Sequence, residues 1–398
     1  MHIPGSDSPS GIIVSRPLSR YSLESKFSLG LEADLETQSH GPHVGDSSCR
    51  PIGIAAGETP ARSRSRPRAR HIGPLAAHAR MTALRAAAET AVRQCLNLEA
   101  GESCAVVTDD KREPIGEAIY DVASEITDDA VIVRYPPGET HGSEPPAPVA
   151  AAMAGADVVL APTTKSLSHT RARTEANEAG ARVATLPGIT EDVFTTGLAA
   201  DYESIAAHCE AVREQVDDAD EIRVTTDAGT DITFGVADRE WLSDTGIVHD
   251  PSEMSNLPAG EVFISPETAD GTFVVDGTMR PHGLLADGHR LTFEVEDGLV
   301  THISDDEIRE TIEGAAADVG NAAYNLAELG IGTNVAVTEL VGSVLLDEKA
   351  GGTVHIAIGD NAGIGGETEA PIHLDGILRE PTVFADGDPI ELPTPDAD

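Results

Sequence analysis

Strands and helices alternate regularly between residues 103 and 188, and this alternation limits the first half of the chain to one class of fold. Apolar runs suited to buried strands occur at 103–110, 130–135, 157–163 and 181–188. Segments typical of helices lie between them, at 113–126, 147–156 and 169–181. This order predicts βαβ units and a mostly parallel sheet. Polar residues at the strand ends, such as those at 108–110 and 163–166, should then gather at one sheet edge, where ligands of α/β proteins usually bind.

The pattern changes after a long helix predicted at 200–220. Residues 221–236 are typical of a hairpin with a glycine-containing turn, and further strand-like runs follow it. One helix is predicted at 305–327. We therefore expect an α/β domain at 81–215 and an α+β, β-rich metal-binding domain at 216–398.

Residues 1–80 differ in composition from the remainder. They carry nine arginines and one lysine against seven acidic residues, and they are rich in serine, proline and glycine. Apolar residues are too few to offset the conformational entropy of the chain. We expect a disordered extension, or a start site assigned too far upstream, with the folded protein beginning near Met81. The alternative, a nucleic-acid-binding arm around the arginine run at 62–70, conflicts with the acidity of the rest.

The net charge of −41 is extreme, with 68 acidic residues against 27 lysines and arginines. Such a surface repels nucleic acid and anionic membranes, so neither is expected as a partner. It suits a protein kept soluble in concentrated salt, where screening weakens self-repulsion. No apolar run is long enough to span a membrane. We predict a protein of a salt-loving cytoplasm.

The four cysteines, Cys49, Cys95, Cys104 and Cys209, include no CxxC pair. Scattered cysteines without a secretory signal indicate reduced thiols in a cytosol. A zinc–thiolate site and a disulfide framework are therefore not expected.

Candidate metal ligands are concentrated in the last fifth of the chain. The segments GTVHIAIGDN (352–361) and PIHLDG (371–376) place His355, His373 and Asp375 among glycines and β-type apolar residues. His373 and Asp375 are two apart, so both side chains leave the same face of a strand. Imidazoles and a carboxylate held this way suit a divalent metal. The chain contains no GxGxxG motif and no Walker-type loop, so no nucleotide is expected.

Four segments together resemble a known family. NLPAGEVF, LGIGTN, LLDEKAGGTVHIAIGDN and PIHLDGILREPTV, in this order, look like the metallo-aminopeptidase family of the thermophilic aminopeptidases S and T. The resemblance extends over roughly residues 90–390. It implies two divalent ions (zinc, cobalt or manganese). It also implies a homodimer, although the residues themselves give no sign of a dimer interface. The ligands implied are Glu261, Glu328, Glu348, His355, His373 and Asp375.

The resemblance also implies a chemistry. Two metal ions would activate a water molecule that attacks the first peptide bond of a small peptide. Glu328 or Glu348 would act as the catalytic base. One departure weakens this expectation, because the family's catalytic tyrosine after the strand histidine is replaced here by Asp360 and Asn361.

A second interpretation belongs to another reaction class. The same superfamily resembles iron(II)-dependent ring-cleaving dioxygenases of the dihydroxypyridine type. His355, His373 and Asp375 would supply a two-histidine, one-carboxylate face for iron. The further carboxylates Glu261 and Glu328 favour two hydrolytic metals, so the aminopeptidase is our main prediction. A non-catalytic metal-binding relative is the third possibility.

Overall fold

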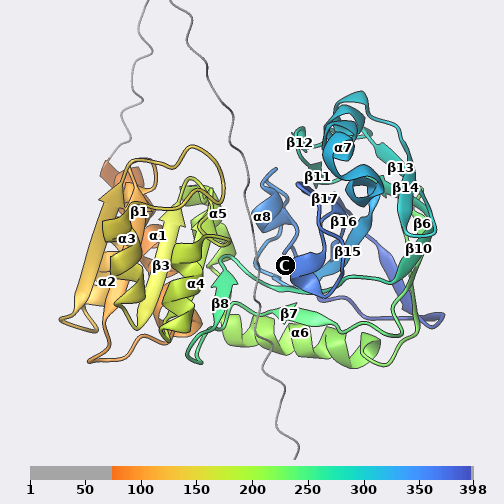
Figure 1. The fold of residues 1–398 in the computed structure, drawn as a ribbon. Coiled ribbons are helices and arrows are strands. Elements are labelled where there is room, and N and C mark those ends of the chain that lie inside the picture. The colour runs from red at the N-terminus through yellow and green to blue at the C-terminus, as the bar shows by residue number, and fades with distance from the viewer. Residues whose placement is uncertain (1–73, 396–398) are drawn as a thin grey trace, which may run out of the picture. The chain divides into compact units, whose positions relative to one another are not determined.

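The amino-terminal part of the protein is built on a parallel sheet flanked by helices (Figure 1). A computed structural model describes residues 74–395. The sheet has the strand order β2-β1-β3-β4-β8, and each neighbouring pair is parallel. Its strands are β1 (Cys104–Asp109), β2 (Ala130–Tyr135), β3 (Val158–Thr163), β4 (Arg182–Pro187) and β8 (Met254–Asn256). The predicted α/β fold with a mostly parallel sheet is confirmed.

Helices cover both faces of this sheet because its central strands bury alternate residues in two different cores. Val106 and Leu160 pack in the core that includes residues of the first two helices, whereas Val107 and Ala161 pack with residues of the next two. These helices are α1 (Pro74–Glu89), which continues as a π-helical turn (Thr90–Cys95), α2 (Glu113–Ser124), α3 (Ala147–Ala154) and α4 (Arg171–Glu178).

The first helix starts earlier than the sequence indicated. We expected it from Met81, but α1 begins at Pro74. Arg80, the residue before Met81, forms an ion pair with Glu191 at the start of α5 (Glu191–Gly197). The extension predicted for residues 1–80 otherwise lies outside the described residues, as does Cys49.

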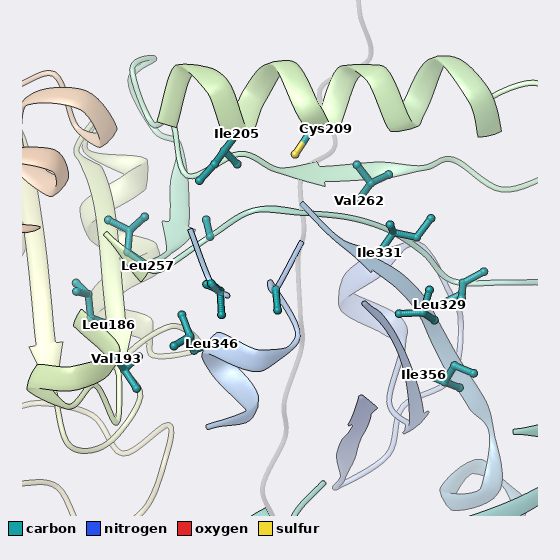
Figure 2. Close-up of a cluster of buried hydrophobic side chains, with 14 of the residues drawn as sticks. Leu186, Val193, Ile205, Cys209, Leu257, Val262, Leu329, Ile331, Leu346 and Ile356 are labelled. Atoms are coloured by element: carbon teal, nitrogen blue, oxygen red, sulfur yellow. The ribbon is translucent and has the colours of Figure 1, made fainter. Parts of the chain in front are cut away.

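The long helix expected at 200–220 is α6 (Tyr202–Val216), and it lies against the carboxyl-terminal sheet. Figure 2 shows Ile205 and Cys209 pointing from α6 toward the strand that carries Val262. The Cys209 thiol also contacts the Thr333 hydroxyl at 3.2 Å and the Glu261 carbonyl oxygen at 3.6 Å. The helix therefore packs directly behind a residue predicted to bind metal.

The carboxyl-terminal part contains two antiparallel seven-stranded sheets, which confirms the β-rich prediction. One sheet has the order β14-β13-β10-β6-β5-β18-β19, with bounds β5 (Glu221–Thr225), β6 (Asp231–Gly235), β10 (Thr268–Val275), β13 (Leu291–Glu296), β14 (Leu299–Ile303), β18 (Thr382–Ala385) and β19 (Asp388–Pro389). The other has the order β12-β11-β17-β16-β15-β9-β7, with bounds β7 (Leu242–Asp244), β9 (Glu261–Ile264), β11 (Thr278–Met279), β12 (Gly283–Leu284), β15 (Leu326–Gly332), β16 (Val354–Gly359) and β17 (His373–Leu378).

The helix predicted at 305–327 is shorter than expected. Asp305 caps the start of helix α7 (Asp306–Val319), because its carboxylate accepts hydrogen bonds from the Glu307 and Ile308 amides. The helix ends at Gly320, which has a φ of 63°. A 3₁₀ turn (Gly320–Tyr324) follows, and β15 then starts at Leu326. Glu328 therefore lies within a strand, and the prediction that the helix continues to residue 327 is wrong.

Loops from the two parts meet around Tyr202 and Asn334. The buried Tyr202 hydroxyl donates to the Gly197 carbonyl and accepts from the Ala259 amide, both at 3.2 Å. The Asn334 side-chain amide donates to the same Gly197 carbonyl at 3.1 Å and to Ala259 at 3.0 Å. These bonds fix the segment that enters β9. No helix among residues 74–395 has the length and apolar character needed to cross a bilayer.

Replacing Tyr202 by Phe should lower the free energy of unfolding by about 1–3 kcal/mol, because the Ala259 amide would lose its buried acceptor. Denaturant unfolding in concentrated salt measures the change. Tyr120→Phe is the matched control, since that half-buried hydroxyl makes no hydrogen bond to a described residue. Equal stability of Tyr202→Phe and the parent protein would contradict this role.

Candidate metal centre

Four adjacent strands of the sheet that runs from β12 to β7 present polar side chains on one of its faces. Their order is β17-β16-β15-β9. Strand β9 supplies Glu261, β15 supplies Glu328, β16 supplies His355, and β17 supplies His373 and Asp375. Residues paired across neighbouring strands share a face, so the register decides which of these groups can meet.

A small residue lies opposite each of these side chains. Glycines pair with three of them, Gly332 with Glu261, Gly330 with His355 and Gly359 with His373. Ala357 pairs with both Glu328 and Asp375. A Cβ atom on Gly330 would lie 2.0 Å from Nε2 of His355, so the imidazole occupies the space above the glycine. The small residues thus leave room for polar groups to converge.

Glu328 is the centre of the cluster. Its Oε1 lies 3.2 Å from Nε2 of His355, and its Oε2 lies 3.2 Å from Nε2 of His373. His373 Nε2 is also 3.3 Å from Oδ1 of Asp375. His355 Nε2 is 3.4 Å from Oε2 of Glu261. Two groups of ligand atoms result, Glu261–Glu328–His355 and Glu328–His373–Asp375, each within 4.8 Å.

The second group is more open and has a histidine oriented as metal ligands usually are. The His373 side chain is 34% exposed, whereas that of His355 is 1% exposed. His373 Nδ1 lies 2.7 Å from the Asp360 carbonyl oxygen, an acceptor only, so Nδ1 carries the proton and donates it. In the neutral ring Nε2 then presents its lone pair toward Glu328 and Asp375.

Burial and ion pairing shift the pKa values of these groups in opposite directions. Burial alone would raise the pKa of Glu328, but hydrogen bonds from His355 and His373 bring it below its usual value. Burial opposes protonation of His355, yet Glu328 and Glu261 raise its pKa to about 9. Against the same penalty, Asp375 and Glu328 raise the pKa of His373 to about 12. The carboxylates therefore stabilise positive charge here, whether carried by protons or by a metal ion.

Lys349 is a charged partner that sequence analysis missed. Its ammonium group is buried and forms ion pairs with Glu261 and, at 3.0 Å, with Glu348 Oε1. Burial would lower its pKa, but Glu261, Glu348 and Asp244 hold it well above the usual value. The available signal was its rarity, since it is one of four lysines and directly follows Glu348.

The structure brings five of the six proposed ligands into the two groups. Glu348 stands apart from them and pairs with Lys349. Of the proposed iron face, His373 and Asp375 lie in one group and His355 in the other, with Glu328 shared by both. The cause is the register, because His355 pairs with Gly330 and Ile377, four residues along β16 from the partner of His373.

The residues present fit a divalent metal ion. Glu328, His373 and Asp375 offer two carboxylates and one imidazole, which suit iron, manganese, cobalt or zinc. The proton on His373 Nδ1 is directed to a backbone carbonyl, as is common for metal-bound imidazoles. In the other group, Oε2 of Glu261 is buried without a hydrogen-bond partner among the described residues.

A parallel α/β sheet joined to a β-rich part that gathers metal-binding groups defines a candidate metalloenzyme. A family model described as NicX, 2,5-dihydroxypyridine 5,6-dioxygenase, matches residues 84–392. The chain therefore belongs to this family. The match makes it a relative of oxidoreductases, so our prediction of a hydrolase with metalloexopeptidase activity is wrong. The base roles that we assigned to Glu328 and Glu348 depended on that prediction.

Two solved structures share the fold. The 2,5-dihydroxypyridine dioxygenase from Pseudomonas putida KT2440 has a TM-score of 0.63 and 18% identity, over 80% of this chain and 97% of its own. Wild-type AmpT from Thermus thermophilus has a TM-score of 0.54 and 19% identity, over 77% of this chain and 96% of its own. The resemblance to the aminopeptidases is thus one of shared fold. No curated protein matches this chain.

Replacing Gly330 by Ala should displace the His355 ring, because the new methyl group would occupy its position. Glu328 would lose a hydrogen-bond donor, and we expect metal affinity to fall by about 10- to 100-fold. Calorimetric titration with Mn(II) measures this. Gly314→Ala is the control, because its Cβ would meet nothing within 4 Å. Unchanged affinity in Gly330→Ala would show that His355 does not support the site.

Proposed function

We propose that this protein is an iron(II)-dependent ring-cleaving dioxygenase acting on a dihydroxylated pyridine or a closely related hydroxylated ring. The family match supports the reaction class. The observation that carries the proposal is the partly exposed group of Glu328, His373 and Asp375, with Nε2 of His373 directed at both carboxylates. Three ligands on one side of an ion leave positions for oxygen and substrate.

The residues of the chain have separate roles in this proposal. Glu328, His373 and Asp375 would hold the iron, which when bound supplies the redox chemistry that lets molecular oxygen react with an aromatic ring. His355, buried behind Glu328, is a positioning residue that donates a hydrogen bond to it. The Asp360 carbonyl fixes the orientation of the His373 ring. Two of the three proposed ligands, Glu328 and His373, thus have their geometry set by neighbours.

Positive groups near the end of β11 support an anionic substrate. Met279 pairs with Gly376, the residue after Asp375, and Arg280 directly follows Met279 at the end of β11. Burial lowers the pKa of His141, and the charges of Lys165 and Arg280 lower it further. Lys165 follows β3 at the carboxyl edge of the parallel sheet. In so acidic a protein, such a grouping suits an ionised ring hydroxyl or a carboxylate.

Hydrogen bonds hold the carboxyl edge of the parallel sheet close to Lys165. Asp109, at the end of β1, accepts hydrogen bonds from the Thr164 amide at 2.5 Å and the Thr164 hydroxyl at 3.0 Å. The residues that we expected to gather at this edge therefore meet. They hold the segment that carries Lys165.

Replacing His373 or Asp375 by Ala should abolish iron binding and lower the rate of oxygen uptake by more than about 100-fold. The loss should be this large because mutating a residue that only hydrogen-bonds to a metal ligand already lowers metal affinity or activity by about 10- to 100-fold. An oxygen electrode measures the rate after anaerobic loading with Fe(II), using 2,5-dihydroxypyridine and related rings in concentrated salt. His302→Ala, an exposed histidine on β14, is the control. A parent protein that binds iron but consumes no oxygen with any such ring would contradict the proposal.

Replacing Arg280 by Ala should raise KM about 10- to 100-fold with a smaller effect on kcat, because a hydrogen bond to a charged group contributes about 1.5–3 kcal/mol. The exposed Arg290 provides a control with the same change of charge. Steady-state kinetics over a range of ring concentrations separate the two constants. Equal KM values for Arg280→Ala and Arg290→Ala would exclude this binding role.

A further inference from the structure

We propose that the Lys349 ammonium is a built-in cation that takes the place of a second metal ion, so that this chain holds one divalent ion, between Glu328, His373 and Asp375. The inference rests on the proposed metal centre, but it concerns the number of ions and not the reaction. It makes Lys349 a residue that determines metal stoichiometry.

The ligand groups by themselves would allow two ions. Glu328 belongs to both groups, and its two oxygens face opposite ways, Oε1 toward His355 and Oε2 toward His373. A carboxylate shared in this way is suited to bridging a pair of metal ions. Pairs about 3.5–4 Å apart are typical of hydrolytic sites that activate water.

Lys349 adds a positive charge to the first group, Glu261–Glu328–His355, by pairing with Glu261. Its ammonium contacts Oε1 of Glu261, a member of this group, and Oε1 of Glu348. A divalent ion bound by Glu261 would stand beside this ammonium in a buried environment, where like charges repel strongly. Because Lys349 is only 5% exposed, solvent screens that repulsion little.

The backbone around Lys349 is fixed, so the side chain starts from a set position. The Lys349 carbonyl accepts a hydrogen bond from the Asn334 amide at 2.8 Å, and its own amide donates to Leu346 at 3.1 Å. The next residue, Ala350, packs closely against Gly332. A Cβ atom on Gly332 would lie 2.1 Å from the Ala350 carbonyl oxygen. Gly332 is the strand partner of Glu261, which ties this turn to the ion pair.

The second group has no such competitor. Its ion-pair partners among the described residues are imidazoles and not a lysine or arginine: His373, whose ring nitrogen is itself the candidate ligand, and His355, which contacts Glu328 from the first group. Its side chains are also more exposed than those of the first group, at 34% for His373 and 14% for Asp375. A metal ion can therefore bind between Glu328, His373 and Asp375 while the Lys349 ammonium stays beside Glu261 in the first group. One metal with open positions suits oxygen and a ring substrate.

Metal counting on the whole protein tests the inference. The parent, Lys349→Met and Lys349→Arg are stripped with a chelator and loaded with excess Mn(II) or Zn(II). After removal of free metal, ions per chain are counted by elemental analysis. We expect one ion for the parent and for Lys349→Arg, which keeps the charge, and two for Lys349→Met. Lys111→Met, at an exposed lysine, is the matched control and should stay at one. Spin coupling between two Mn(II) ions gives an independent readout for Lys349→Met.

Two results would overturn the inference, namely two ions per chain in the parent, or one ion in a Lys349→Met variant whose circular dichroism matches the parent. If Lys349→Met does not fold, Lys349→Gln, which also removes the charge, takes its place in the count. A parent that binds no ion at all would overturn the proposed metal centre itself. A parent with one ion and no oxygen uptake would remove the dioxygenase and leave the stoichiometry intact.

Discussion

Carboxylates buried in a β-sheet need cations, and this requirement organises the carboxyl-terminal half of the protein. Glu261 and Glu328 are each 6% exposed and lie on adjacent strands. Neither could remain ionised there without a positive partner. Lys349 supplies one, and the imidazoles of His355 and His373 supply the others. Glu328 connects both imidazoles, so the positions of these two rings depend on it.

The packing around this network keeps its geometry fixed. Glycine or alanine lies opposite each polar side chain across the strands, and α6 packs behind Glu261. Asn334 connects the end of β15 to the loop before β9 and to the end of α5. Side chains held by a rigid sheet and by neighbouring hydrogen bonds are the arrangement that metal sites require.

Local sequence patterns were enough for the first half of the fold. Buried strands such as Val158–Thr163 are largely apolar runs flanked by helical segments, so their positions needed no knowledge of tertiary contacts. The segment at 326–332 was different, because an alanine-rich helix precedes it with only Gly320 between them as a stop signal. Its seven buried residues are explained by pairing with β9 and β16, which are distant in sequence.

The same limit applies to the metal centre. Motifs identified Glu261, Glu328, His355, His373 and Asp375, but motifs do not state which residue opposes which. Register separates His355 from His373 and places Glu328 between them. Lys349 was overlooked because a lysine is rarely considered where metal ligands are sought. Its importance appears only once the turn after α8 (Val344–Asp347) brings its amine to Glu261.

Anomalous X-ray scattering at the iron edge, from crystals of the full chain loaded anaerobically with Fe(II), tests the central claim most directly. The account predicts one peak per chain, within bonding distance of Glu328, His373 and Asp375, with the Lys349 ammonium still beside Glu261. A peak between Glu261 and His355, or two peaks bridged by Glu328, would contradict it.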